Sequence, residues 1–189
     1  MGQAKRKRYA TAMHEASHVV VGLDCGRKLV RCSVVPERAV AGYGRADGTT
    51  EWEPIGDGTM NVNEVVKIAL AGRIAEERIY GKVQGGSVRD DLALIYTLAW
   101  MAAVGSEKFT PHVRLIPLLT RIYCKHPHKV PRRAKSLGDE MISDALPEVR
   151  EILERRWPDV ELIAALLLQH GRITPEVIPP GLYLAAHWR

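Results

Sequence analysis

The sequence predicts a mainly α-helical α+β protein, with a small β-sheet near its N-terminus and a helical bundle towards its C-terminus. Three observations lead to this class. Apolar residues recur at helical spacing in several long segments, one short segment is rich in valine, and the composition is that of an ordinary globular chain, with 46% hydrophobic and 26% charged residues. A chain of 189 residues is long enough to bury a core without disulfides or metal.

These patterns predict one main domain with short terminal segments. In chain order we expect a basic tail over 1–8, a domain over 9–178 and a C-terminal extension over 179–189. Within the domain we expect helices over 9–25, 62–80, 89–104, 134–156 and 158–169, and strands over 29–35 and 40–45.

Local signals set the bounds of the N-terminal elements. Apolar side chains from Ala10 to Leu23 recur at helical spacing, and Gly26 follows as a stop. The valine-rich strand ends at Pro36. The segment 40–45 contains two glycines and suits an edge strand, and residues 47–60 are dense in turn formers and predict a loop.

The later helices show caps or apolar faces. Asn61 or Asn63 caps the second helix, and Gly81 ends it. The helix over 89–104 is apolar nearly all round, which predicts a central position. Four prolines break the segment 108–137 into short pieces, and two amphipathic helices follow it.

The net charge of +5 comes from two local segments. Residues 5–8 are all basic, and the segment 108–137 contains eight basic residues and no acid. The surface is therefore not basic throughout, and the second segment offers few aromatic residues for base stacking, which argues against nucleic-acid binding. A solvated basic face is the simpler interpretation, and an acidic partner is the alternative.

The cysteines and the apolar runs bear on location. The three cysteines are odd in number, form no CxxC pair and follow no signal peptide, which predicts a reducing, cytoplasmic setting. No apolar run reaches the roughly 18–20 residues of a membrane span, so we expect no membrane insertion. No phosphate-binding GxxxxGK[ST] loop occurs, so we expect no bound nucleotide.

The sharpest chemical signal is an HExxH pattern formed by His14, Glu15 and His18 on the first predicted helix. Residues four apart lie on one helix face, so the two imidazoles can bind one Zn²⁺. Glu15 can reach a metal-bound water and accept its proton. A histidine pair packed on an amphipathic helix is the alternative explanation of this pattern.

A catalytic zinc needs a third protein ligand, and two acidic pairs can supply it. Glu76 and Glu77 lie late in the second predicted helix, whereas Asp90 and Asp91 lie at the start of the third. Each pair also has a plain structural explanation, because the glutamates suit a solvated face and the aspartates oppose a helix dipole.

A second group of metal-ligand residue types lies in the basic segment. Cys124, His126 and His128 are close in sequence, and His112 precedes them. Pro127 separates the two histidines and no matching ligand pair exists, so we expect no second metal there.

Four motifs in order resemble one family. Tyr9–Gly22, Ser33–Tyr43, Ile68–Gly81 and Gly85–Ala99 are similar to segments of the peptidase domain of the FtsH family of membrane-anchored AAA zinc proteases, and Ala134–Ile178 resembles its closing helices more loosely. In the first motif a serine stands where the family usually has glycine.

The resemblance implies a zincin-like fold with zinc bound by His14, His18 and an aspartate, and Glu15 as catalytic base. Aligning the helix selects Asp91 as that aspartate, whereas aligning the glycine loop without a gap selects Asp90. We favour Asp91, because a packed helix tolerates a shift less than a loop tolerates an insertion. For Glu76 and Glu77 an outer, supporting role is the better fit.

The resemblance further implies a zinc-dependent metalloendopeptidase that acts on protein or peptide substrates. Because these residues include no ATPase module, we expect hydrolysis of unfolded or flexible chains without ATP, with the segment 40–45 pairing with substrate backbone. The alternative is a non-catalytic zinc-binding adaptor that uses the basic 108–137 face. The sequence predicts no particular oligomeric state.

Overall fold

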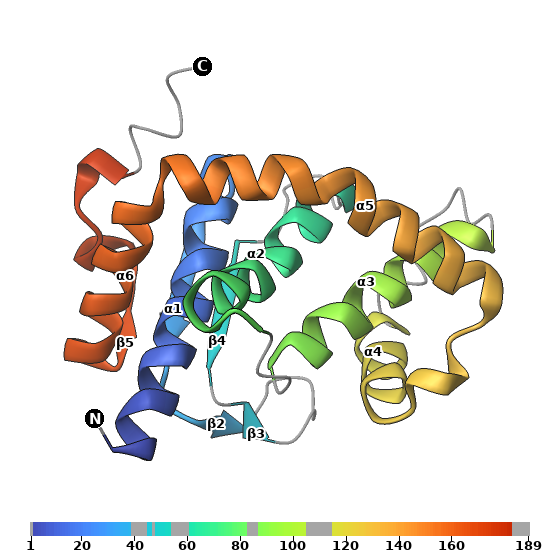
Figure 1. Ribbon diagram of the computed structural model, residues 1–189, viewed down its shortest axis with the longest axis horizontal. Coiled ribbons are helices and arrows are strands. Elements are labelled where there is room, and N and C mark those ends of the chain that lie inside the picture. Colours follow the sequence, from blue (N-terminus) through green and yellow to red (C-terminus); the bar gives the residue numbers. More distant parts are fainter. Residues whose placement is uncertain are drawn as a thin grey trace.

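The computed structural model describes residues 2–38, 45–46, 48–53, 61–82, 87–104 and 115–182. The predicted class, a mainly helical α+β fold, is confirmed (Figure 1). The helices are α1 (Gln3–Asp24), α2 (Val62–Tyr80), α3 (Ser87–Ala103), α4 (Ile116–Lys125), α5 (Arg132–Arg155) and α6 (Trp157–His170). The strands are β1 (Leu29–Ser33), β2 (Glu37–Arg38), β3 (Arg45–Ala46), β4 (Thr49–Trp52) and β5 (Arg172–Ile173), and two short 3₁₀ helices cover Pro127–Lys129 and Pro175–Val177.

Helix α1 is the central element of the N-terminal half. Every residue from Ala12 to Leu23 is buried, because α1 packs between α2 and α6 and against β1 (Figure 1). The helix begins at Gln3 and not near Tyr9, so most of the predicted basic tail is helical. No residue between Gln3 and Tyr9 breaks a helix, and four exposed cations can continue one without joining the core.

A three-stranded antiparallel sheet lies against α1, with β1 between β4 and β5. Cys32 of β1 lies opposite Thr50 of β4. The prediction of a loop throughout 47–60 is therefore wrong over β4, and the two-residue strand β5 was not predicted. Both strands are stabilised by pairing with distant residues, which local sequence does not reveal.

Strands β2 and β3 form a separate antiparallel pair. The predicted strand 40–45 falls between them, and apart from Arg45 it lies outside the described residues. Of the predicted C-terminal extension, residues 183–189 lie outside them as well.

Helix α2 follows its sequence signals closely. Asn61 is the N-cap, and its side chain accepts hydrogen bonds from the backbone N–H groups of Asn63 and Glu64. Gly81 ends the helix with φ of 66°, a left-handed conformation that favours glycine. The prediction of this helix, including its final residue Tyr80, is confirmed.

The later helices pack against the N-terminal helices. The long helix α5 runs across α1, α2 and α3, and α3 packs between α2, α4 and α5 (Figure 1). Pro117 lies in the first turn of α4, where a missing N–H leaves no hydrogen bond unmade, so a proline thought to break the chain instead starts a helix. None of the described helices is long and apolar enough to cross a membrane.

Candidate metal centre

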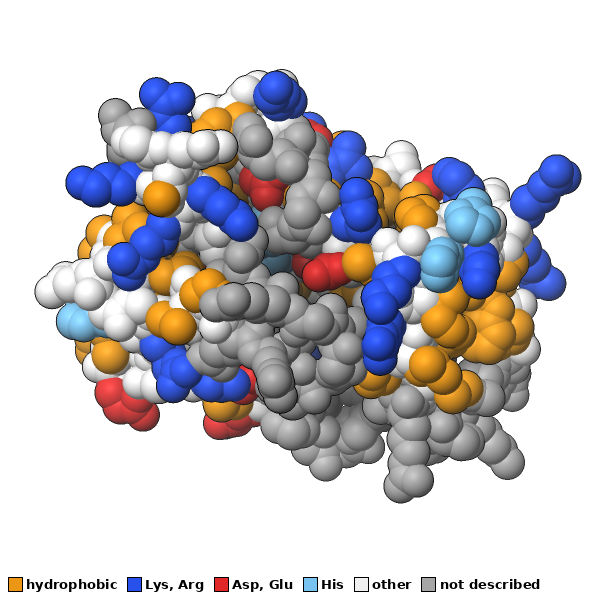
Figure 2. Space-filling model, turned by 90° about the horizontal axis from the view of Figure 1, so that it is seen from below, with side chains coloured by type: hydrophobic (Ala, Val, Ile, Leu, Met, Phe, Trp, Pro, Cys, Tyr) orange, Lys and Arg blue, Asp and Glu red, His pale blue; other side chains and the backbone are white. Residues whose placement is uncertain are grey.

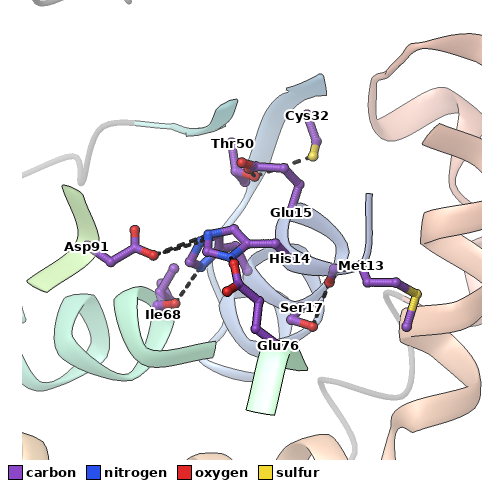
Figure 3. A network of polar contacts seen from close by, with 10 residues as sticks. Met13, His14, Glu15, Ser17, Cys32, Thr50, Ile68, Glu76 and Asp91 are labelled. Atoms are coloured by element: carbon purple, nitrogen blue, oxygen red, sulfur yellow. Dashed lines mark hydrogen bonds and ion pairs between the residues drawn. The ribbon is translucent and has the colours of Figure 1, made fainter. Parts of the chain in front are cut away.

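Two histidines of α1 meet at their ring nitrogens inside the protein. His14 and His18 are only 2% and 7% exposed, and their Nε2 atoms lie 3.0 Å apart. Their spacing of four residues places both rings on one face of α1, as the sequence predicts. Figure 3 shows the His14 ring with Asp91 on one side and Glu76 on another.

The opposite ring nitrogens are held by helix α2. His18 Nδ1 donates to the backbone oxygen of Ile68 at 2.6 Å, and His14 Nδ1 lies 3.0 Å from the carboxylate Oε1 of Glu76. Acceptors at Nδ1 fix the proton there in a neutral imidazole and leave Nε2 with a lone pair. This arrangement, with a carboxylate or carbonyl behind each imidazole, is typical of metal-binding histidines.

Asp91, in the first turns of α3, completes the group. Its Oδ2 lies 3.2 Å from Nε2 of His14 and 3.6 Å from Nε2 of His18. This oxygen is buried and accepts no well-directed hydrogen bond from the described residues. Among the described residues, these are the only three ligand-type side chains whose donor atoms all lie within 4.8 Å of one another.

The donor set fits a zinc ion. Two imidazole lone pairs at 3.0 Å repel each other, and a buried carboxylate oxygen facing them adds negative charge, so the cluster requires a cation or protons between its atoms. Two histidine nitrogens and one carboxylate oxygen form a standard ligand set for zinc with a further position open.

The electrostatics of the cluster favour positive charge. Burial alone lowers the pKa of His14, but the neighbouring carboxylates of Asp91 and Glu76 outweigh burial and raise this pKa to about 10. For His18 burial also lowers the pKa, and the charge of Asp91 reverses the sign and raises it. Burial raises the pKa of Asp91, whereas the two histidines lower it to about 2. Without metal, the pocket therefore holds a proton tightly.

Glu15 lies on the side of α1 that faces strand β4. It is only 5% exposed, and Thr50 Oγ1 donates a hydrogen bond of 2.7 Å to its Oε2 (Figure 3). A Cβ added to Gly48 would lie 2.6 Å from the other carboxylate oxygen, Oε1. The sequence analysis did not identify Thr50 or Gly48, because it predicts a loop over the segment 47–60 that contains both.

A mid-helix glycine makes room for the first histidine. A Cβ at Gly72 of α2 would lie 2.3 Å from Cε1 of His14, so the imidazole packs directly on the helix backbone. Glycine costs about 1 kcal/mol in a helix interior relative to alanine. A glycine inside a predicted helix, within the motif Ile68–Gly81, is the sequence signal that could have marked Gly72 as part of the site.

The remaining acidic candidates point elsewhere. Asp90 Oδ1 accepts a hydrogen bond of 2.6 Å from the Cys124 thiol, away from the histidines. Glu77 forms ion pairs with Arg73 and Arg150 at the surface. Glu76 is buried behind His14, on its Nδ1 side.

The second group of ligand types is not assembled in the part of the chain that the structure describes. His126 and His128 lie edge to face with ring centroids 5.8 Å apart, and Cys124 bonds Asp90 instead. His112 lies outside the described residues. The Lys and Arg side chains of the described part of segment 108–137 are exposed. On the face shown in Figure 2, basic side chains are scattered among other types.

Comparison with known proteins shows which proteins this chain is similar to. No protein-family model matches the chain. It is 30% identical over 175 residues to the ATP-dependent zinc metalloprotease FtsH 3 of Sorangium cellulosum, covering 86% of this chain and 26% of that protein. It is 29% identical to the ATP-dependent zinc metalloprotease FtsH of Mycoplasmopsis pulmonis and 27% identical to that of Rhodothermus marinus, each over 94% of this chain and 27% of the relative.

The similarity thus extends over nearly the whole chain, which spans about a quarter of the length of these curated relatives. The similarity of this chain to proteins named FtsH zinc metalloprotease supports an FtsH-family peptidase domain.

Proposed function

We propose that this chain is a zinc-dependent metalloendopeptidase in which His14, His18 and Asp91 hold the metal and Glu15 is the general base. One observation carries the proposal. The two Nε2 atoms and a buried Asp91 oxygen converge within 4.8 Å, while both Nδ1 atoms are engaged by α2. A purely structural zinc has no use for a carboxylate held beside its ligands, so the position of Glu15 favours catalysis.

The chemistry divides between metal and protein. Bound zinc supplies Lewis acidity to a water and to the peptide carbonyl. The residues of this chain do the rest: Glu76 and Ile68 keep both imidazoles in one tautomer, and Glu15 takes a proton from the attacking water. The same carboxyl then returns the proton to the departing amine, which completes hydrolysis.

The substrate class follows from the surroundings of Glu15. Within the described residues strand β4 pairs only with β1, and we propose that an extended peptide pairs with its other edge. An extended strand must be unfolded or flexible before it can bind there. Because the 189 residues contain no phosphate-binding loop, we propose that this chain itself cleaves such substrates without ATP.

The three cysteines, all free thiols in the structure, support the expected cytoplasmic location.

The direct test is Glu15→Gln, which keeps the shape of the side chain and removes its basicity. We expect the variant to bind one zinc as the wild type does and to lose at least roughly 100-fold in the rate of cleavage of denatured fluorescein-labelled casein. Cleavage at the wild-type rate would contradict the proposed mechanism.

The wild-type protein, compared with this variant, separates the enzyme from the adaptor. A wild type that binds zinc but does not cleave, and whose binding of a protein partner depends on the exposed cations of segment 108–137, would favour the adaptor. Nucleic-acid binding through that segment would instead weaken steeply as salt rises.

A further inference from the structure

We infer that Thr50 is a positioning residue for Glu15, holding one carboxylate oxygen so that the other is free to take the proton. The inference rests on the proposed function, because it assigns to Glu15 the role of general base. It concerns a residue of strand β4 that no motif in the sequence marks.

The direction of the hydrogen bonds is fixed by counting protons. Thr50 has one hydroxyl hydrogen, and it is donated to Oε2 of Glu15 at 2.7 Å. The Cys32 sulfur lies 3.3 Å from the same hydroxyl oxygen, so the thiol must be the donor there. Burial raises the pKa of Cys32 well above its usual range, and the charge of Glu15 adds to that, so the thiol keeps its proton. The chain of donors therefore runs from Cys32 through Thr50 to Glu15 (Figure 3).

The two oxygens of Glu15 meet different surroundings. Oε2 carries the hydrogen bond from Thr50, whereas Oε1 lies against Gly48, where a Cβ would approach to 2.6 Å. Thr50 thus fixes the rotation of the carboxylate, and the missing side chain at position 48 leaves the space that the carboxylate occupies. Proton transfer to Oε1 needs no change in the Thr50 contact.

A second contact, between Trp52 and Gly22, also holds strand β4 against α1. It lies on the same face of each element as the contact between Thr50 and Glu15. Glu15 and Gly22 are seven residues apart and share one face of α1, while Thr50 and Trp52 are two apart and share one face of β4. The Trp52 ring packs on Gly22 so closely that a Cβ there would overlap it. This contact sets the position of β4, and therefore of the Thr50 hydroxyl, relative to Glu15.

The test compares Thr50→Val, Thr50→Ser and Thr49→Val in the full 189-residue chain loaded with zinc. Valine keeps the shape of threonine without the hydroxyl, and serine restores the hydroxyl. Thr49 is the matched control, because its buried hydroxyl on the same strand has no hydrogen-bond partner among the described residues.

On denatured fluorescein-labelled casein we expect Thr50→Val to lower kcat by roughly 10- to 100-fold with KM unchanged, as for a lost hydrogen bond to a charged group. Thr50→Ser should recover most of the rate, and Thr49→Val should match the wild type. If Thr50→Val cleaves at the wild-type rate while Glu15→Gln is inactive, the inference is wrong and the proposed function stands. If Glu15→Gln cleaves normally, the proposed function itself is wrong.

A structural readout tests the inference without any cleavage. In crystals of the zinc-loaded variants, the Glu15 carboxylate should leave its place between Gly48 and position 50 in Thr50→Val and return to it in Thr50→Ser. Zinc content should equal that of the wild type in both. An unmoved carboxylate in Thr50→Val would overturn the inference.

Discussion

In each histidine of the centre, Nδ1 contacts the protein and Nε2 faces the proposed metal position. The spacing of His14 and His18 could be predicted from the sequence, because four residues make about one helical turn. The identity of their Nδ1 partners could not, since Glu76 and the Ile68 carbonyl reach them through tertiary packing. The choice between Asp90 and Asp91 depended on an alignment, and the structure directs only Asp91 towards the histidines.

Removing the negative charge behind His14 should weaken zinc binding. We expect Glu76→Gln to lower zinc affinity by about 10- to 100-fold, because the amide supports the imidazole less well than the carboxylate does. Glu77→Gln is the control, since Glu77 pairs with arginines at the surface. Competition with a chromophoric chelator measures both affinities, and equal values would show that Glu76 has no such role.

Substitution of the two adjacent aspartates should have very different effects on zinc affinity. We expect Asp91→Asn to lower zinc affinity by more than roughly 100-fold, because a charged ligand is lost. Asp90→Asn should leave affinity within a few-fold, because Asp90 bonds only the Cys124 thiol in the described structure. The same chelator competition reports both, and a larger loss in Asp90→Asn would reverse the assignment.

At the scale of elements, two mid-helix glycines allow close packing around α1. The ring of His14 covers Gly72 of α2, and the ring of Trp52 covers Gly22 of α1 itself. One contact orients a proposed metal ligand, and the other anchors β4. A substitution at Gly72 should therefore affect the metal centre, and a substitution at Gly22 should affect the position of β4.

Alanine at these glycines should destabilise the protein although it favours helix. We expect Gly72→Ala and Gly22→Ala each to lower the free energy of unfolding by roughly 1–3 kcal/mol, because the added methyl overlaps a ring. Only Gly72→Ala should also weaken zinc binding. Urea unfolding and chelator competition provide the two readouts, and a stabilised Gly72→Ala protein would mean that the imidazole does not pack as described.

The elements with strong local signals were predicted well. Gly81 marked the end of α2, and Asn61 was one of the two caps predicted for its start. Strand β4 was missed because its pairing with β1 is non-local and its neighbours are turn formers. Helix α4 was missed because Pro117 was treated as a breaker, although the first turn of a helix tolerates proline.

For the whole molecule, the metal centre lies where α1, α2 and α3 meet, beside a continuous apolar core that includes α5 and α6. That core does not depend on the metal, so the fold should survive without zinc. The negative surroundings that raise the pKa of His14 to about 10 let a proton replace part of the cation's charge.

Removing zinc should therefore lower stability without unfolding the protein. Free zinc at about 1,000 times Kd contributes about 4 kcal/mol to the free energy of unfolding, which corresponds to roughly 8–16 °C in Tm for a chain of this size. We expect excess chelator to lower Tm by that order while the helical circular dichroism at 25 °C persists. Loss of the helical signal on chelation would mean that the metal holds the fold together.

The most direct test of the central claim is the metal content and position in the purified protein: elemental analysis, then an anomalous difference map at the zinc edge. The account predicts one zinc per chain, with its anomalous peak between Nε2 of His14, Nε2 of His18 and the Asp91 carboxylate. A protein that takes up no zinc when supplied with it, or a peak at Asp90 or beside Cys124, would contradict the account.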